Sequence, residues 1–289
     1  MDIQALQAFI AVAERQSFSK GAEQLFITQS AISKRISTLE SQLDTALFDR
    51  IARQVTLTEA GRALLPRAKA LLIDLEDTRR EIKNLSGAVS GTLSLAASHH
   101  ISLHRLPLLL KEYSQMYPKV KLDLRFEESE VGYSGVLQGD IELAIITLSP
   151  QPNENIHSVP IWRDRMQFVV SPEHPLAHTE NITLESLTQY SAILPSTSTF
   201  TRQLLEQRFQ DEALSLDVSM STNNLDTIRM MVSIGLGWSL LPESLIGDDL
   251  TILSPNEPPI FRELGVIHHR NRSLSNAARQ LLDMLGTLT

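Results

Sequence analysis

The feature that most constrains the fold is a long amphipathic segment that begins at Thr58 and continues to about residue 85. Its apolar side chains recur at alternating steps of four and three residues, the heptad spacing of a helix that pairs with another helix. The residues on this seam are Leu64, Ala68, Leu71, Leu75, Ile82 and Leu85, interrupted once by the polar Thr78. A helix of roughly 28 residues is about 42 Å long. That length favours a dimerising linker over the alternative, a core helix of one globular domain.

The chain is long enough for two or three compact units around this helix. It has 289 residues, of which 42% are apolar and 21% are charged. It contains no cysteine, which excludes disulfides, thiolate metal sites and thiol nucleophiles and fits a reducing compartment. The first residues lack the basic and apolar blocks of a secretory signal. The longest near-apolar stretch, residues 230–242, is shorter than the ~18 residues of a membrane span, so we expect a cytoplasmic chain without a membrane anchor.

Charge is distributed unevenly along the chain. The net charge of −8 argues, on its own, against a nucleic acid partner. Residues 1–70, however, carry nine Lys or Arg against seven Asp or Glu, whereas residues 91–289 carry 14 against 23. The slightly basic first part and the acidic second part suggest separate tasks, with contact to nucleic acid confined to the first.

Three helices are predicted ahead of a small hairpin in the first part of the chain. Apolar residues at helical spacing predict a helix around residues 6–13, and Ser17 offers a cap for a short helix over residues 20–25. Thr28 is a natural N-cap for a third helix that ends near Asp44, a residue that tolerates the left-handed conformation. The predicted apolar face of this third helix consists of Ile32, Ile36, Leu39 and Leu43.

The second and third helices have the spacing of a helix-turn-helix. Two short helices joined by a tight turn let the second enter a DNA major groove, roughly 12 Å wide, while the first crosses the backbone. The hairpin expected over residues 50–57 carries two arginines that suit the adjoining backbone or minor groove. The predicted DNA-binding residues are Ser17, Thr28, Gln29, Ser30, Ser33, Lys34, Arg35, Arg50 and Arg53. Gln29 can pair with adenine, and Lys34 and Arg35 with guanine or phosphate. A helical bundle with solvated polar faces is the alternative.

Strands and helices alternate after a glycine- and serine-rich hinge at residues 86–91. The first set of predicted strands covers residues 92–97, 120–126 and 141–146, with helices over 103–117 and 131–138. The second set has strands over residues 167–170, 192–194, 216–219 and 238–241, with helices over 200–209 and 225–233. This order implies mostly parallel sheets covered by helices, in two lobes that face each other across a cleft.

Polar residues gather where the predicted strands end. Ligands of α/β sheets bind at the carboxyl ends of strands, where helix N-termini offer unpaired N–H groups to anions. The predicted effector-binding residues at these positions are Ser98, His99, His100, Ser129, Thr147, Ser196, Thr197, Ser198 and Thr199. Helix capping is the alternative role for each one. As a set they favour a small polar ligand, with a mild preference for an anionic one.

No cofactor, metal or catalytic residue is expected. The adjacent histidines at 99–100 and 268–269 are expected to point apart on strands or turns, and no carboxylate partner accompanies them. The GLG at residues 235–237 lacks the third glycine and the preceding strand of a dinucleotide fingerprint. No nucleophile elbow is present.

Residues 1–62 resemble the DNA-binding domain of LysR-type transcriptional regulators. The matching motifs are TQSAIS at 28–33, Leu39-Glu40, LFDR at 47–50 and LTEAG at 57–61. The second part is similar as well, through YPKV at 117–120, GDIELAI at 139–145, HPLA at 174–177 and GLGWSLLP at 235–242. The departures are modest: Gly21 stands where alanine is common, Asp44 where glycine usually ends the helix, and Ala46 where proline is frequent.

The resemblance implies an N-terminal all-α winged helix-turn-helix, a long linker helix and a C-terminal α/β effector domain with two lobes, like a periplasmic binding protein. The expected domains are residues 1–58, 59–90 and 91–289, with lobe I at about 91–162 and 267–289 and lobe II at about 163–266. The resemblance also implies a homotetramer, a dimer of dimers, whose linker helices pair antiparallel and whose sensor domains pair side by side. It implies an effector held between the lobes, activation of transcription and control of the chain's own gene.

The sequence therefore predicts a DNA-binding transcriptional regulator and not an enzyme. The expected partners are double-stranded promoter DNA, a small-molecule effector, further copies of the chain and RNA polymerase, with no membrane. A two-lobed solute-binding protein and a cleft enzyme without a DNA role are the alternatives. Neither explains the helix-turn-helix pattern in residues 1–62.

Overall fold

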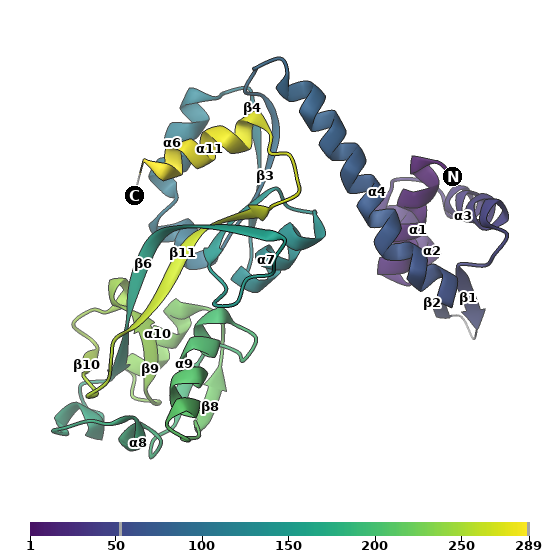
Figure 1. Ribbon diagram of the computed structural model, residues 1–289. Helices are drawn as coiled ribbons and strands as arrows, with labels where there is room; N and C mark the ends of the chain where they lie inside the picture. Colours follow the sequence, from purple (N-terminus) through teal and green to yellow (C-terminus); the bar gives the residue numbers. More distant parts are fainter. Residues whose placement is uncertain (52–53, 288–289) are drawn as a thin grey trace. The chain divides into compact units, whose positions relative to one another are not determined.

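The computed structural model describes residues 1–51 and 54–287, which form two compact units, Met1–Ser86 and Gly87–Thr289 (Figure 1). Within the described residues, no helix has both the length and the apolar character that crossing a membrane requires.

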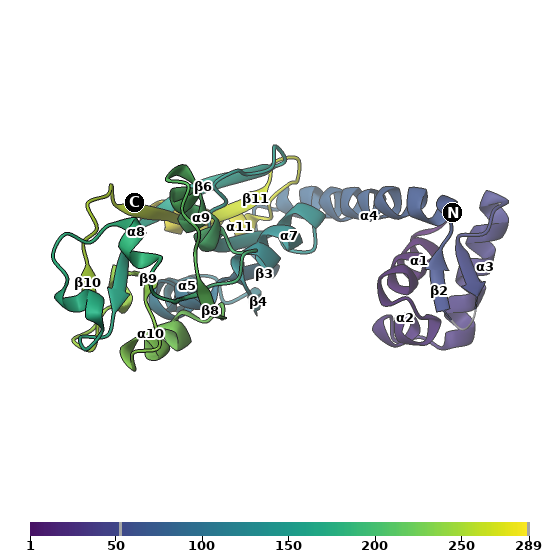
Figure 2. The ribbon, with the colours of Figure 1, turned by 90° about the horizontal axis from the view of Figure 1, so that it is seen from below.

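The first unit is built mainly from helices (Figure 2). Their apolar side chains form a small core. The elements of the unit are α1 (Ile3–Arg15), α2 (Phe18–Gln24), α3 (Gln29–Leu43), β1 (Phe48–Ile51), β2 (Gln54–Leu57) and α4 (Glu59–Asn84). Phe9, Ile32 and Ile36 are fully buried at its centre. Side chains cap the helices as the sequence predicts: Ser17 accepts the Lys20 N–H at 3.3 Å, and Thr28 accepts the Ala31 N–H at 3.2 Å.

Two of the motifs in this unit have a direct structural reason. The carboxylate of Glu40 accepts the N–H groups of Leu47 and Phe48, at 2.8 and 3.4 Å, and so fixes the start of the β1–β2 hairpin. Gly61 lies so close to Leu47 that an added Cβ would come within 2.2 Å of the Leu47 carbonyl oxygen. A larger residue at position 61 would therefore push α4 away from the hairpin.

The third helix differs from the prediction at one residue. Asp44 ends α3 in the left-handed conformation, at φ 49°, as predicted. Ile32, Ile36 and Leu39 are buried, but Leu43 is 39% exposed, because the helix passes the edge of the core before its last turn.

The apolar seam of α4 is partly uncovered. The first half of the helix packs on α1, where Ala68 is buried and Lys69 pairs with Glu14 at 2.5 Å. Farther along the same seam, Ile82 and Leu85 are 65% and 86% exposed. Such exposure is costly for large apolar side chains unless another surface covers them.

The second unit contains a seven-stranded mixed sheet and a separate two-stranded sheet. Its strands are β3 (Gly91–Ala97), β4 (Val120–Phe126), β5 (Leu143–Thr147), β6 (Ile156–Val170), β7 (Ala192–Leu194), β8 (Val218–Ser221), β9 (Ser239–Pro242), β10 (Thr251–Leu253) and β11 (Ile260–His269). The large sheet has the order β10-β6-β11-β5-β3-β4, with β9 also paired to β6, whereas β7 pairs with β8. Strands β3, β4 and β5 are parallel, as the alternating pattern predicts. The expectation of a mostly parallel sheet is wrong, because β11 pairs antiparallel with β5 and β6, and β6 pairs antiparallel with β9 and β10.

The helices of this unit include one that begins at a proline inside a predicted helix. They are α5 (His99–His104), α6 (Pro107–Met116), α7 (Ser129–Gln138), α8 (Leu184–Leu187), α9 (Phe200–Asp211), α10 (Leu225–Ser233) and α11 (Asn276–Gly286), with short 3-10 turns at Pro175–His178 and Glu243–Leu245. The single helix predicted over residues 103–117 is wrong. Pro107 lacks a backbone donor and so begins a new helix instead of continuing the old one.

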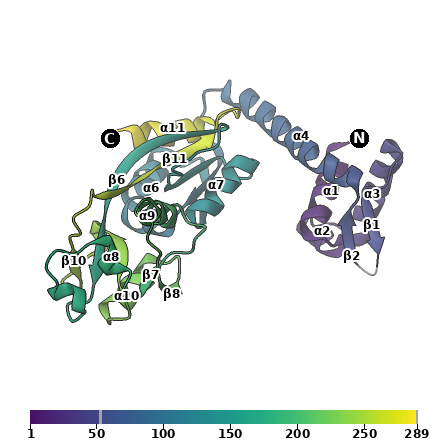
Figure 3. The same ribbon diagram turned by 60° about the horizontal axis from the view of Figure 1, so that its bottom comes forward.

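Two long antiparallel strands, β6 and β11, run through both lobes (Figure 3). The sequence predicts only residues 167–170, at the end of β6, and none of β11. Val266 packs in the core of lobe I, whereas Met166 and Ile260 pack in the core of lobe II. The chain thus crosses between the lobes near Arg262 on β11, a few residues before the expected boundary at 266. A Cβ on Gly265 would lie 2.2 Å from the Val159 carbonyl oxygen, so the close approach of these strands requires glycine there.

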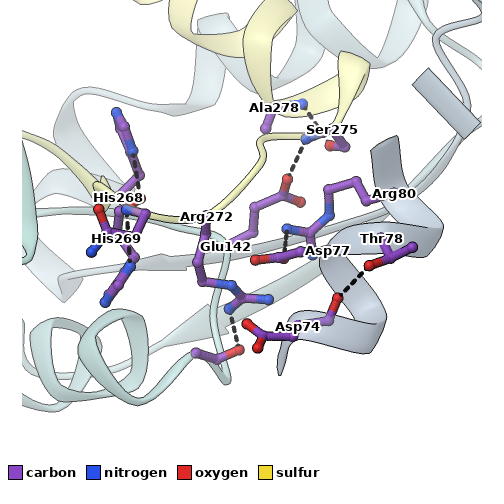
Figure 4. A network of polar contacts seen from close by, with 12 residues as sticks. Asp74, Asp77, Thr78, Arg80, Glu142, His268, His269, Arg272, Ser275 and Ala278 are labelled. Atoms are coloured by element: carbon purple, nitrogen blue, oxygen red, sulfur yellow. Dashed lines mark hydrogen bonds and ion pairs between the residues drawn. The ribbon is translucent and has the colours of Figure 1, made fainter. Parts of the chain in front are cut away.

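Helix α11, also absent from the prediction, closes lobe I. The Tyr113 hydroxyl donates to the Ala277 carbonyl at 2.8 Å, and Leu281 is fully buried. Glu142 accepts the Ser275 N–H at 2.6 Å, and Ser275 in turn caps α11 by accepting the Ala278 N–H (Figure 4). These bonds tie the last helix of the chain to the start of β5.

Candidate functional sites

A tight turn positions α3 after α2. The Phe26 N–H donates to the Glu23 carbonyl at 3.1 Å, and the Ile27 N–H donates to the Ala22 carbonyl at 3.0 Å. Phe26 itself has a φ of 54° and is 97% exposed. A left-handed aromatic residue that is fully exposed contributes nothing to the core, and the sequence pattern does not single it out.

The predicted DNA-binding residues of α3 lie on its solvent face. Gln29 and Lys34 are exposed, Ser33 and Arg35 are half-buried, and all four side chains lack a hydrogen bond or ion pair to other described residues. The hydroxyls of Thr28 and Ser30 are 3.0 Å apart at the start of the helix. The first turn of α3 carries no acid, so its N–H groups are free of a neighbouring negative charge. This face can therefore offer donors to phosphates and base edges without breaking contacts of its own.

The remaining predicted DNA-binding residues lie outside α3. Ser17 is half-buried and caps α2. Arg50 belongs to β1, where its backbone is opposite Val55. Its side chain, like the whole of Arg53, lies outside the described residues. Lys20, exposed in the first turn of α2 and not among the predicted residues, is a further cation of this region.

The second unit holds a cleft between its lobes with a volume of about 130 Å³. It is lined by Ser98, His99, His100, Leu103, Glu128, Ser129, Glu130, Thr147, Pro195, Thr199, Thr201, Asn223, Asn224, Leu225, Asp226 and Arg262. Six of the nine predicted effector-binding residues are in this lining: Ser98, His99, His100, Ser129, Thr147 and Thr199.

The other three, Ser196, Thr197 and Ser198, are not in the lining. They belong to the loop before α9, where the Ser196 N–H donates to the Asn223 side chain at 2.9 Å and the Ser196 and Ser198 hydroxyls are 2.8 Å apart. Their hydrogen bonds shape this loop and leave Thr199 to face the cleft.

Some of the cleft hydroxyls are engaged and others are not. Ser129 accepts the Thr147 N–H at 3.1 Å, and Thr199 caps α9 by accepting the Arg202 N–H at 3.2 Å. The hydroxyls of Thr147 and Thr201, whose residues are only 6% and 8% exposed, have no partner among the described residues. One comes from each lobe, so a polar ligand in the cleft could bond to both.

A buried ionic cluster forms one wall of the cleft. Asp164 accepts two hydrogen bonds from Arg262, at 2.9 and 3.1 Å, and one from Arg105 at 3.2 Å. His100 Nε2 lies 3.7 Å from the same carboxylate and has no hydrogen bond to any described residue. Burial, and then the charge of Arg262, lower the pKa of His100 to about 4, so the imidazole is neutral near pH 7. Arg262 thus already forms an ion pair with Asp164 inside the protein.

The sequence prediction missed several cleft residues. Arg262 and Asp164 lie on parts of the two crossing strands that the sequence pattern does not predict. Asn224 and Asp226 follow β8 and begin α10, so the strand-end rule that found Ser98 could also have found them. No three His, Asp or Glu side chains of the described residues are grouped as a metal site would need.

The fold and the two sites define a class: a DNA-binding regulator in which a helix-turn-helix is joined to a two-lobed ligand-binding domain. Sequence comparison agrees. The bacterial regulatory helix-turn-helix protein of the lysR family matches residues 3–62, and the LysR substrate binding domain matches residues 86–288. The chain therefore belongs to the LysR family of transcriptional regulators, which confirms the predicted family and fold class.

Individual proteins are similar to this chain over more than 90% of their own length. The uncharacterized HTH-type transcriptional regulator YbhD of Escherichia coli K12 is 30% identical over 99% of this chain and 92% of its own. The full-length CbnR structure, complexed with its target DNA, has a TM-score of 0.64 at 20% identity and covers 100% of both chains. The effector binding domain of QuiR in complex with shikimate has a TM-score of 0.61 at 22% identity, over 68% of this chain and 95% of that domain. The relatives' names are those of regulators and not of enzymes.

Proposed function

We propose that residues 1–58 of this regulator recognise promoter DNA, with α3 in the major groove. The observation that carries the proposal is the exposed face of α3. Its Gln29, Ser33, Lys34 and Arg35 side chains form no hydrogen bond or ion pair with other described residues, while the opposite face of the same helix is buried. Thr28, Ser30 and Ser17 would contact phosphates, as would Arg50 and Arg53 of the hairpin. CbnR, whose structure contains its target DNA, supports this assignment.

We further propose that residues 91–289 bind a small polar effector, with an anionic group, between the lobes. Ser98, His99, His100, Ser129, Thr147 and Thr199 supply the polar lining. The QuiR domain, which has a similar fold, is complexed with shikimate, a hydroxylated carboxylic acid. An effector can change DNA binding only if its affinity differs between two arrangements of the protein.

Residues 59–90 would join copies of the chain into a dimer of dimers. The exposed Ile82 and Leu85 of α4 support this role, because pairing of two such helices would remove them from water. The proposal places the assembly in the cytoplasm, as an activator that also controls its own gene and contacts RNA polymerase.

The test is a DNA-binding measurement on a duplex selected from a random pool by the full-length chain. Lys34→Ala should weaken binding by about 1–3 kcal/mol if Lys34 contacts a base, and should make the salt dependence shallower by about one unit if it contacts a phosphate. Lys119→Ala, an exposed lysine in the other unit, is the matched control and should change neither quantity. Equal binding by both variants would contradict the role of α3.

A further inference from the structure

The two lobes are joined across the cleft by a hydrogen bond from a side chain of one lobe to the end of a helix in the other. Glu130, in the first turn of α7 in lobe I, accepts the N–H of Phe200 through Oε1 at 2.6 Å. Phe200 is the first residue of α9 in lobe II. The rings of Phe200 and Tyr133, which is also on α7, meet edge to face with centroids 5.6 Å apart. A carboxylate of the protein itself thus occupies the ligand cleft.

The start of α9 is suited to a carboxylate. This helix has 12 residues and no acid in its first turn, so its N–H groups and its dipole favour a negative charge from elsewhere. Thr199 caps the Arg202 N–H and Glu130 takes the Phe200 N–H, whereas the Thr201 N–H has no acceptor among the described residues. Three further groups of the cleft lining have no hydrogen-bond partner among the described residues. They are the nearly buried hydroxyls of Thr201 and Thr147 and the buried Nε2 of His100.

Glu130 accepts only part of the hydrogen bonds that the donors around the start of α9 can form. It bonds to one N–H group of α9 and leaves the donors of Thr201 and Thr147 unused. Its burial raises the pKa of the Glu130 carboxyl, which means that the charged form loses hydration in the cleft, although the Phe200 N–H partly compensates. A carboxylate with both oxygens free to reach these donors would form more hydrogen bonds than Glu130 does.

We propose that Glu130 is an internal ligand of the cleft, and that the effector is a small carboxylate that replaces the Glu130 carboxylate at the start of α9. This inference rests on the proposed effector-binding function and names its ligand class. Replacement breaks the Glu130–Phe200 hydrogen bond, so effector binding exchanges a contact between the lobes for contacts to the ligand. An effector with a cationic group would behave in the opposite way, because Glu130 would hold it instead of competing with it.

Acetate tests the site in the full-length chain. The variant Glu130→Ala lacks the atoms of one acetate ion and so leaves a matching space at α9. Sodium acetate should raise the Tm of this variant relative to sodium chloride at equal ionic strength, and should leave the wild-type Tm unchanged. Glu112→Ala, an exposed glutamate of α6 that is outside the cleft lining and has no side-chain hydrogen bond to the described residues, is the control and should behave as the wild type. Adding Thr201→Val to Glu130→Ala should diminish the acetate effect.

A panel of small carboxylates and amines tests the effector class. A carboxylate that binds the wild type should bind Glu130→Ala at least about fivefold more tightly, because its competitor is gone. Glu130→Gln, which keeps the shape of the side chain, should also bind it more tightly and covers the case in which Glu130→Ala does not fold.

Three results would overturn the inference: no acetate effect on a folded Glu130→Ala, equal carboxylate affinity in wild type and both variants, or an amine that binds the wild type and is lost in Glu130→Gln. A ligand lost with Thr147→Val and Thr201→Val but unaffected at Glu130 would refute the internal ligand and leave the proposed effector function standing. If acetate binds Glu130→Ala but no small molecule of the panel binds the wild type, the internal ligand stands and the proposed effector function is refuted.

Discussion

The two candidate sites handle their polar groups in opposite ways. On α3, Gln29, Lys34 and Arg35 extend from a helix whose other face is buried, and they bond to no other residue in the described part of the chain. In the cleft, by contrast, two charged groups are already bonded to the protein itself, as Arg262 is to Asp164 and Glu130 is to Phe200. A surface that meets the charged DNA backbone can leave its donors in water. In a buried cleft a charged group needs a partner more, because an unpaired charge there costs much more stability than an unpaired hydroxyl.

This difference predicts that substitutions in the cleft change folding stability, whereas substitutions on α3 change DNA binding and leave stability almost constant. The largest effect is expected for Asp164→Ala. It leaves the Arg262 side chain, which is 4% exposed, buried without its partner, and should lower the free energy of unfolding by about 3–5 kcal/mol. Urea unfolding of the full-length chain measures the change.

An ion pair of the first unit provides the contrast. Lys69 and Glu14 are 29% and 40% exposed, so Lys69→Ala should cost at most about 1 kcal/mol. A loss of similar size in the two variants would mean that the Asp164 cluster is not the main support of the cleft wall.

The second prediction concerns pH and His100. Its pKa in the folded chain is about 4, below the ordinary 6.5, so the unfolded state takes up the proton first as the pH falls. His100 therefore contributes stability that is fully present above pH 6.5 and is lost between pH 6.5 and about 4, up to about 3 kcal/mol. The wild type should lose more stability over this range than His100→Gln does. Parallel pH profiles of the two proteins would refute the assignment.

A smaller effect is expected at Phe26, in the turn before α3. Asparagine tolerates the left-handed conformation better than phenylalanine, and the exposed ring has no core contact to lose. Phe26→Asn should raise the free energy of unfolding by up to about 1 kcal/mol. Phe26→Ala keeps the strained conformation and serves as the control, with no gain. A clear loss of stability in Phe26→Asn would show that the ring packs against something in solution.

The smallest effect on stability is predicted for Gln29→Ala. Since the side chain is exposed and makes no hydrogen bond to the described residues, stability should stay within about 0.5 kcal/mol of the wild type. Binding to the selected duplex should weaken by about 1–3 kcal/mol at an adenine-containing position. A stability loss together with unchanged DNA binding would reverse the comparison between the two sites.

The sequence predicts these two sites to different extents, for a physical reason. The third helix is one contiguous segment whose N-cap Thr28, buried Ile36 and terminal Asp44 all follow local rules. The cleft collects residues from Ser98 to Arg262, and the strand-end rule finds those that begin helices. It does not find Arg262, because the position of β11 depends on pairing with β6, which is far away in the sequence. A local sequence pattern does not show such a pairing.

The fold shows the same division. The parallel β3, β4 and β5 were predictable because each is followed or preceded by a helix with a clear apolar period. The crossing strands combine Pro160, charged residues and short apolar runs, so their alternation is weak. The long pairing that joins the lobes is therefore a product of tertiary structure more than of local preference.

The most direct test of the account is whether occupancy of the cleft changes DNA binding. The measurement is the Kd of the full-length chain for its selected duplex, with and without a small carboxylate that raises the Tm of the wild-type protein. The account predicts a change of at least about fivefold, absent in the Thr147→Val, Thr201→Val double variant. A carboxylate that binds in the cleft and leaves the Kd for DNA unchanged would contradict it.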